Sequence, residues 1–115
     1  MPKGIYLEGP PLMNPKLTSY PYTQSNTSIF ENIFKSDNVL MNHVVVEPGQ
    51  SFPKHPTDAE VYALVVKGVL SIAIEEESPE NYEAGRVVYI PKGLLSELAN
   101  KSEGIVELFV VKTNL

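Results

Sequence analysis

The amino-acid sequence predicts a single all-β domain, and three observations lead to that prediction. The chain has 115 residues, a length typical of one domain. From residue 28 onward, short runs rich in β-branched and aromatic residues recur at intervals of about 8–12 residues, with turn residues between them. No long amphipathic helix is evident after residue 36. This combination is typical of a β-sandwich or a β-barrel.

Three candidate strands precede the middle of the chain. Residues 28–34 (SIFENIF) have apolar side chains at a spacing that a helix would also give, and residues 36–38 (SDN) then predict a turn. The next run, VLMNHVVVEPGQ at residues 39–50, is β-branched until its Pro-Gly pair ends the strand. Residues 60–67 (EVYALVVK) are almost continuously apolar, as expected of a strand buried on both faces.

The remaining candidate strands are separated by glycine turns. Residues 69–75 (VLSIAIE) alternate, so that Leu70, Ile72 and Ile74 share one face. Glycines also mark the later turns. The strands expected between these turns are residues 86–90, 95–100 and 105–112. The acidic run at residues 75–81 (EEESPEN) is expected to be a solvated loop.

The N-terminal region differs from the rest of the chain. Half of the ten prolines lie within the first 21 residues, and proline excludes a regular helix or a central strand. The same stretch contains too many tyrosines and leucines for a disordered tail. We therefore expect residues 1–27 to form an extended arm that packs on the barrel or on a partner subunit, and residues 28–115 to form the barrel.

Composition excludes several classes of function. The chain has no cysteine, which rules out disulfides, thiolate metal sites and a cysteine nucleophile. Its net charge is −5 and its nine basic residues are scattered, which argues against a nucleic-acid partner. No apolar run is long enough to cross a bilayer, and the N-terminus does not look like a signal peptide. We expect a soluble, cytoplasmic protein without a nucleic-acid or membrane partner.

A motif in the second half suggests a family. Residues 85–100 (GRVVYIPKGLLSELAN) have Gly85, Pro91, Gly93 and Asn100 at the spacing of the second cupin motif, with Ser96 where that motif has histidine. The glycines allow backbone turns that a Cβ atom would obstruct. The sequence is therefore similar to that of the cupins, which are small β-barrels of jelly-roll type, and the resemblance spans about residues 28–112.

The first cupin motif is present in a degenerate form within residues 49–68 (GQSFPKHPTDAEVYALVVKG). His55 is at the position of the first motif histidine and Thr57 at that of the second. Glu60 is one residue from the strict glutamate position, which Val61 occupies. Because strand side chains alternate, this offset could turn Glu60 away from the barrel lumen, and a β-bulge could restore it.

The resemblance implies a divalent-metal site inside the barrel, but two of its ligand positions carry hydroxyls. Thr57 and Ser96 are poor ligands for transition metals. We therefore expect no bound cofactor. The weaker alternative is a divalent metal held by His55, Glu60 and, if its strand turns it inward, His43.

Three functions follow from these residues. The first is a small-molecule-binding barrel whose pocket contains His55, Thr57 and Ser96. The second is a cupin enzyme, either a metal-dependent dioxygenase or isomerase, or a metal-free epimerase with His55 as base and Tyr62 as the acid. The third is a scaffold with an idle pocket. The resemblance to cupins, which are commonly dimers, also leads us to expect a homodimer. The predicted pocket residues are His43, His55, Thr57, Glu60, Tyr62 and Ser96.

Overall fold

The computed structural model describes residues 16–115, and every regular element in that range is a β-strand. This confirms the all-β prediction, including a strand where residues 28–34 were ambiguous. No helix in the described range could span a membrane. The strands are β1 (Ile29–Lys35), β2 (Val39–Val46), β3 (His55–Pro56), β4 (Glu60–Lys67), β5 (Val69–Ile74), β6 (Glu80–Glu83), β7 (Arg86–Ile90), β8 (Leu95–Ala99) and β9 (Val106–Thr113).

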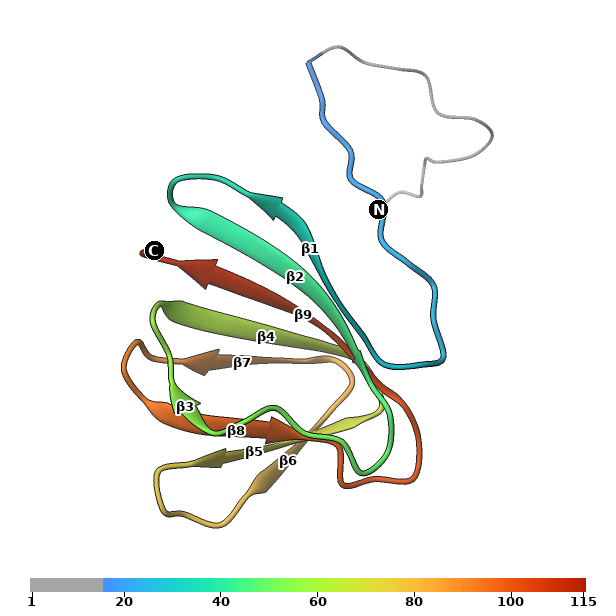
Figure 1. The fold of residues 1–115 in the computed structure, drawn as a ribbon, viewed down its shortest axis with the longest axis vertical. Coiled ribbons are helices and arrows are strands. Elements are labelled where there is room, and N and C mark those ends of the chain that lie inside the picture. Colours follow the sequence, from blue (N-terminus) through green and yellow to red (C-terminus); the bar gives the residue numbers. More distant parts are fainter. Residues whose placement is uncertain (1–15) are drawn as a thin grey trace.

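The strands form two antiparallel sheets that face each other, as Figure 1 shows. One sheet has the order β1-β2-β9-β4-β7 and the other the order β3-β8-β5-β6. The last strand, β9, therefore lies between β2 and β4, and β3 pairs with β8. This pairing brings the two sequence motifs together although they are far apart along the chain.

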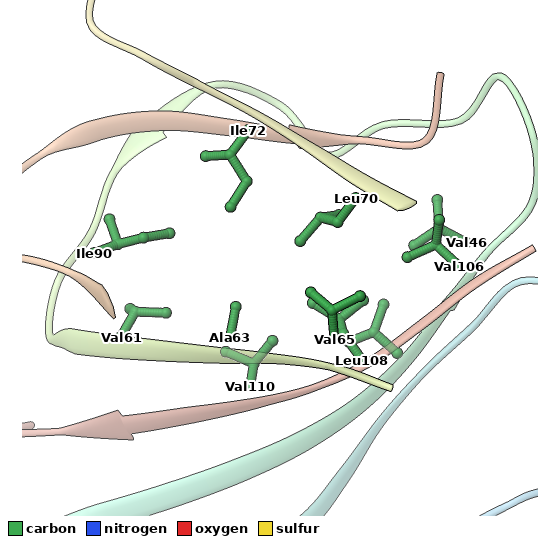
Figure 2. Packing of buried hydrophobic residues seen from close by; sticks show 11 residues of the cluster. Val46, Val61, Ala63, Val65, Leu70, Ile72, Ile90, Val106, Leu108 and Val110 are labelled. Carbon is green, nitrogen blue, oxygen red and sulfur yellow. The ribbon is translucent and has the colours of Figure 1, made fainter. Parts of the chain in front are cut away.

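The core lies between the sheets and fills one end of the barrel. In Figure 2, Leu70 of β5 points toward Val65 and Leu108 on the opposite sheet, with Val46 and Val106 beside them. Leu70, Val106 and Leu108 are completely buried. Burial of one such side chain contributes about 1.5–3 kcal/mol, so this cluster closes that end of the barrel.

The alternation of side chains in β4 differs from the prediction for residues 60–67. Val61, Ala63 and Val65 point into the core, as Figure 2 shows for all three. On the opposite face, Tyr62 is 38% and Val66 48% exposed. The strand is therefore buried on one face only, and its continuous apolar run reflects an apolar outer surface. The homodimer expected from the sequence stays a prediction.

The acidic run at residues 75–81 is only partly a loop. Residues 75–77 are an exposed turn, but β6 begins at Glu80 and pairs with β5 in the four-stranded sheet. Its sequence, ENYE, has little intrinsic strand propensity. Pairing along β5 and the half-buried Tyr82 stabilise it, and neither is visible in the local sequence.

Residues 16–28, which include the whole described part of the expected arm, contain no strand or helix, and Tyr20, Tyr22 and Thr23 join this largely exposed segment to the five-stranded sheet. The ring of Tyr20 is 5.2 Å from that of Phe34, and the ring of Tyr22 is 5.0 Å from that of Phe109. Thr23 donates hydrogen bonds to Glu31 from both its backbone N–H (2.8 Å) and its hydroxyl (2.9 Å). Residues 1–15 of the expected arm lie outside the described residues.

Candidate functional site

A cavity of about 220 Å³ lies between the two sheets beside the packed cluster, and Leu108 belongs to both. Both sheets contribute to its lining. The residues that line it are Phe30, Asn42, Val44, Phe52, Pro53, His55, Thr57, Val61, Ile90, Ser96, Leu98, Leu108, Val110 and Lys112. Of these, Val61, Ile90, Leu108 and Val110 are labelled in Figure 2. Most of the lining is apolar, so its few polar side chains decide how a bound molecule is oriented.

Two of the predicted residues, His55 and Ser96, lie side by side in the cavity wall. They are directly opposite each other in the β3–β8 pair. The Nδ1 atom of His55 is 2.9 Å from the carbonyl of Pro53, which can only accept, so Nδ1 carries the hydrogen. Neither His55 Nε2 nor the hydroxyl of Ser96, which is 3% exposed, has a hydrogen-bond partner among residues 16–115.

Thr57 also lines the cavity, but the single donor of its hydroxyl is already used. It donates to the carbonyl of Pro91 (2.8 Å) and accepts from the backbone N–H of Gly93 (2.9 Å). Thr57 therefore holds the 91–93 turn against β3. Of the two hydroxyls at the motif histidine positions, only that of Ser96 is free to contact a ligand.

Sequence reasoning missed two polar residues of the cavity, Asn42 and Lys112. Asn42 is on β2 between the buried His43 and the intermediate Met41, and Lys112 is two residues beyond Val110 on β9. Both share the inward face with residues such as Val44 and Val110. The alternation of side chains would have identified them if the inward face of these strands had been known.

Glu60 and Tyr62 were expected in the pocket, and the structure places both outside it. Glu60 accepts a hydrogen bond from the hydroxyl of Tyr89 (2.5 Å) and one from the backbone N–H of Lys92 (3.2 Å). Tyr62 stacks on Tyr89 with ring centroids 5.1 Å apart. These side chains lie on the outer face of β4 and β7, because Val61 takes the inward position. The one-residue offset in the motif is therefore real and no bulge corrects it there.

The Tyr89 hydroxyl, and then the Lys92 N–H, hold the pKa of Glu60 below its ordinary value of 4.5. Since the folded-state pKa is lowered, this carboxylate stabilises the fold fully above pH 4.5, and the contribution is lost as pH falls through the lowered pKa. We expect Tyr89→Phe to raise the pKa of Glu60, measured by NMR titration of its carboxyl carbon. Tyr62→Phe keeps the bond and is the control. An equal effect of both substitutions would contradict this assignment.

His43, expected as a possible third metal ligand, also lies outside the barrel. It is completely buried on the outer face of β2. Its Nδ1 is 2.8 Å from Glu31 Oε2 and its Nε2 is 2.6 Å from Glu107 Oε2. The rings of Tyr22 and Phe109 each have centroids 4.8 Å from the imidazole.

This arrangement is an ion cluster beneath the N-terminal segment. The Thr23 backbone N–H, and then His43, hold the pKa of Glu31 below its ordinary value. Both ring nitrogens of His43 are thus engaged, Nδ1 by Glu31 and Nε2 by Glu107. The predicted role of His43 in the pocket is therefore wrong, and its role is to join β1, β2 and β9.

The side chains present do not fit the divalent metal that the cupin motifs imply. His55 is the only histidine that lines the cavity, Thr57 and Ser96 have neutral hydroxyls, and Glu60 is on the other face of its strand. Within residues 16–115, no group of three or more histidine, aspartate or glutamate side chains could hold a metal ion. A single imidazole with hydroxyls is a weak donor set.

Comparison with known proteins agrees with this fold. A family model described as "Cupin domain" matches residues 42–112. The uncharacterized protein MJ0764 of Methanocaldococcus jannaschii is 32% identical over 88 residues, which cover 76% of this chain and 76% of MJ0764. The crystal structure of MJ0764, an RmlC-like cupin family protein with a double-stranded β-helix fold, matches with a TM-score of 0.81 and 30% identity, covering 84% of this chain and 89% of that one.

More distant structures share the architecture alone. A cupin superfamily protein (DSY2733) from Desulfitobacterium hafniense matches with a TM-score of 0.69 and 15% identity, covering 81% of this chain and 83% of its own. The DMSP lyase DddQ from Ruegeria pomeroyi matches with a TM-score of 0.66 and 18% identity, covering 76% of this chain and 47% of its own. The family match over residues 42–112 and the similarity to MJ0764 show that this chain belongs to the cupin family, with an RmlC-like jelly-roll barrel.

Proposed function

We propose that this cupin binds a small molecule in its barrel cavity and does so without a tightly bound metal ion. The observation that carries the proposal is a largely apolar cavity of about 220 Å³ in which the Ser96 hydroxyl and His55 Nε2 have no hydrogen-bond partner within the described part of the chain. An apolar pocket with a few convergent polar groups is the usual form of a small-molecule site.

The metal-free part of the proposal is supported by the ligand positions. Catalytic metal sites typically need three protein ligands, and here only His55 supplies a strong one in the cavity. Elemental analysis of protein purified without chelator is expected to find less than one metal ion per chain. A stoichiometric ion lost in His55→Ala would overturn this part of the proposal.

The binding part can be tested with a matched pair of variants. Val110 and Val111 are adjacent on β9, but only Val110 lines the cavity. Small molecules that raise the melting temperature of the wild-type protein should lose their effect in Val110→Phe, which fills the cavity, and keep it in Val111→Phe. If Val110→Phe does not fold, Ser96→Leu obstructs the same space. If a variant whose cavity is filled still folds and binds the molecule as tightly as the wild-type protein, the proposal is overturned.

A second candidate function, a metal-free enzyme, rests on the tautomer of His55. Because Nδ1 donates to Pro53, the Nε2 atom of the neutral ring has a free lone pair and can act as a general base. Tyr62, the acid partner expected from the sequence, is on the outer face, so the acid would be another cavity residue such as Lys112. The test is to incubate the protein in deuterated water with small molecules that bind to it. If the protein is an enzyme of this kind, the bound molecule should incorporate deuterium, and His55→Ala should abolish that incorporation.

A further inference from the structure

The cavity differs from the rest of the molecule in its charge. The whole chain carries 14 acidic residues and a net charge of −5, yet no aspartate or glutamate among residues 16–115 lines the cavity. Its ionisable side chains are His55 and Lys112, and its other polar side chains are Asn42, Thr57 and Ser96. A cavity with cationic groups and low-dielectric walls attracts anions more strongly than an exposed surface does.

Asn42 is the most informative of these residues because its orientation is determined by its neighbours. It is 6% exposed, and its Oδ1 atom is 3.0 Å from Asn32 Nδ2. Asn32 Nδ2 also lies 3.1 Å and 3.2 Å from two backbone carbonyls, which can only accept, so this atom is the donor and Asn42 presents its oxygen to it. The Nδ2 group of Asn42 then has no partner among the described residues, and the side chain that carries it lines the cavity.

Lys112 lies near Asn42 on the same inward face. Asn42 is opposite Val110 in the β2–β9 pair, and Lys112 is two residues further along β9, which makes it a diagonal neighbour of Asn42. Diagonal neighbours are close enough for a long side chain to bridge. Within residues 16–115, the only ion pair of Lys112 is a loose one, with 3.8 Å between its Nζ atom and the largely exposed Asp58. Its ammonium group therefore has donors to spare for a ligand.

We propose that the ligand of the barrel is a small organic anion with an apolar body and one carboxylate, which Asn42 Nδ2 and Lys112 bind at the cavity wall. This inference rests on the proposed small-molecule function and adds the class of ligand. The free polar groups are mainly donors: the amide of Asn42, the ammonium of Lys112 and the hydroxyl of Ser96. A carboxylate only accepts hydrogen bonds, and charge-assisted bonds to it are stronger than neutral ones.

The size of the cavity limits the body of the ligand. An enclosed apolar cavity of about 150 Å³ holds benzene, so the present cavity of about 220 Å³ fits a molecule with on the order of ten non-hydrogen atoms. Benzoate and hexanoate are of this size. Their rings or chains would contact the apolar lining, such as Phe52, Val44 and Leu108, while the carboxylate contacts Asn42.

The probes for a test are matched sets that differ only in the polar group. Benzoate and hexanoate are compared with the neutral benzyl alcohol and hexanol and with the cationic benzylamine and hexylamine. Dissociation constants are measured by NMR titration of the wild-type protein. We expect at least one carboxylate to bind about tenfold or more tightly than its neutral and cationic counterparts, because one charge-assisted hydrogen bond is worth about that factor.

Two variants test the residues. Asn42→Asp keeps the acceptor for Asn32 but replaces the free donor with a negative charge, so it should abolish carboxylate binding and make the matching amine the preferred probe. Lys112→Gln should weaken the carboxylate about tenfold and leave the neutral probe unchanged. Lys101→Gln, an exposed residue in the 101–104 turn, changes the net charge equally and is the control. If Asn42→Asp does not fold, the comparison of Lys112→Gln with Lys101→Gln tests the proposal.

The outcomes separate this inference from the proposed function. Preferential carboxylate binding that Asn42→Asp reverses and Lys112→Gln weakens supports both. Equal binding of neutral, cationic and anionic probes, with loss of binding in Val110→Phe, overturns the carboxylate but leaves a small-molecule cavity. If none of the probes binds, the carboxylate class proposed for the ligand is overturned. The wider screen for small molecules that raise the melting temperature then tests the proposed function itself.

Discussion

His43→Leu is expected to lower the free energy of unfolding by about 2–4 kcal/mol, one of the two largest effects predicted for this protein. The substitution removes the group that bridges Glu31 and Glu107 and leaves two carboxylates facing a hydrophobic side chain. Removing one partner of a buried ion pair costs about 3–5 kcal/mol. The expected loss is smaller here because the glutamate side chains are 26% and 24% exposed and can regain water.

A charge-free variant shows whether the unpaired carboxylates are the cause. Urea denaturation is compared for His43→Leu and for the triple variant Glu31→Gln, His43→Leu and Glu107→Gln. The triple variant should recover a substantial part of the lost stability, since glutamines can remain in this partly exposed site without a counter-charge. A loss below about 1 kcal/mol in His43→Leu would mean that the cluster is not important for stability.

Gly68→Ala is expected to destabilise the fold by at least about 3 kcal/mol or to prevent folding. Gly68 has a φ of +79°, and a Cβ atom there would be 2.2 Å from the backbone carbonyl oxygen of Ile105. That oxygen is in the backbone just before β9, so the two chain segments would have to separate.

Gly85→Ala is the matched control for the clash at Gly68. Gly85 also has a positive φ, of +96°, but a Cβ atom there would meet nothing within 4 Å. The control should cost only the backbone strain, about 1–2 kcal/mol. The comparison uses chemical denaturation of both variants, and similar losses would show that the close approach to Ile105 is not the source of the constraint.

The fold could be predicted from the sequence because its signals are local. Short β-branched runs and turn glycines predicted most of the strands, and the motif around Gly85 and Pro91 predicted the barrel type. Strands that depend on distant partners could not be predicted in the same way. β6 has little strand propensity of its own, and its pairing with β5 becomes visible only in the folded chain.

The candidate site could be predicted only in part, because the inward face of two strands was not evident. In β2, Val44 and Val45 are both buried. Val44 lines the cavity, whereas Val45 points to the opposite face of the sheet. An apolar pattern on both faces gives no indication of which one is the lumen, so the orientation of His43 stayed open in the sequence and Asn42 was not predicted. His55 and Ser96 were found because the motif spacing, rather than alternation, identified them.

The most direct measurement is the NMR spectrum of nitrogen-15-labelled protein during titration with benzoate. If the barrel cavity holds the ligand as proposed, the side-chain amide signals of Asn42 and the backbone amide of Ser96 should shift and saturate together. The backbone amides of Tyr62 and Tyr89, on the outer face, should stay unchanged. Saturable shifts confined to the outer face, with Asn42 and Ser96 unaffected, would contradict binding in the cavity.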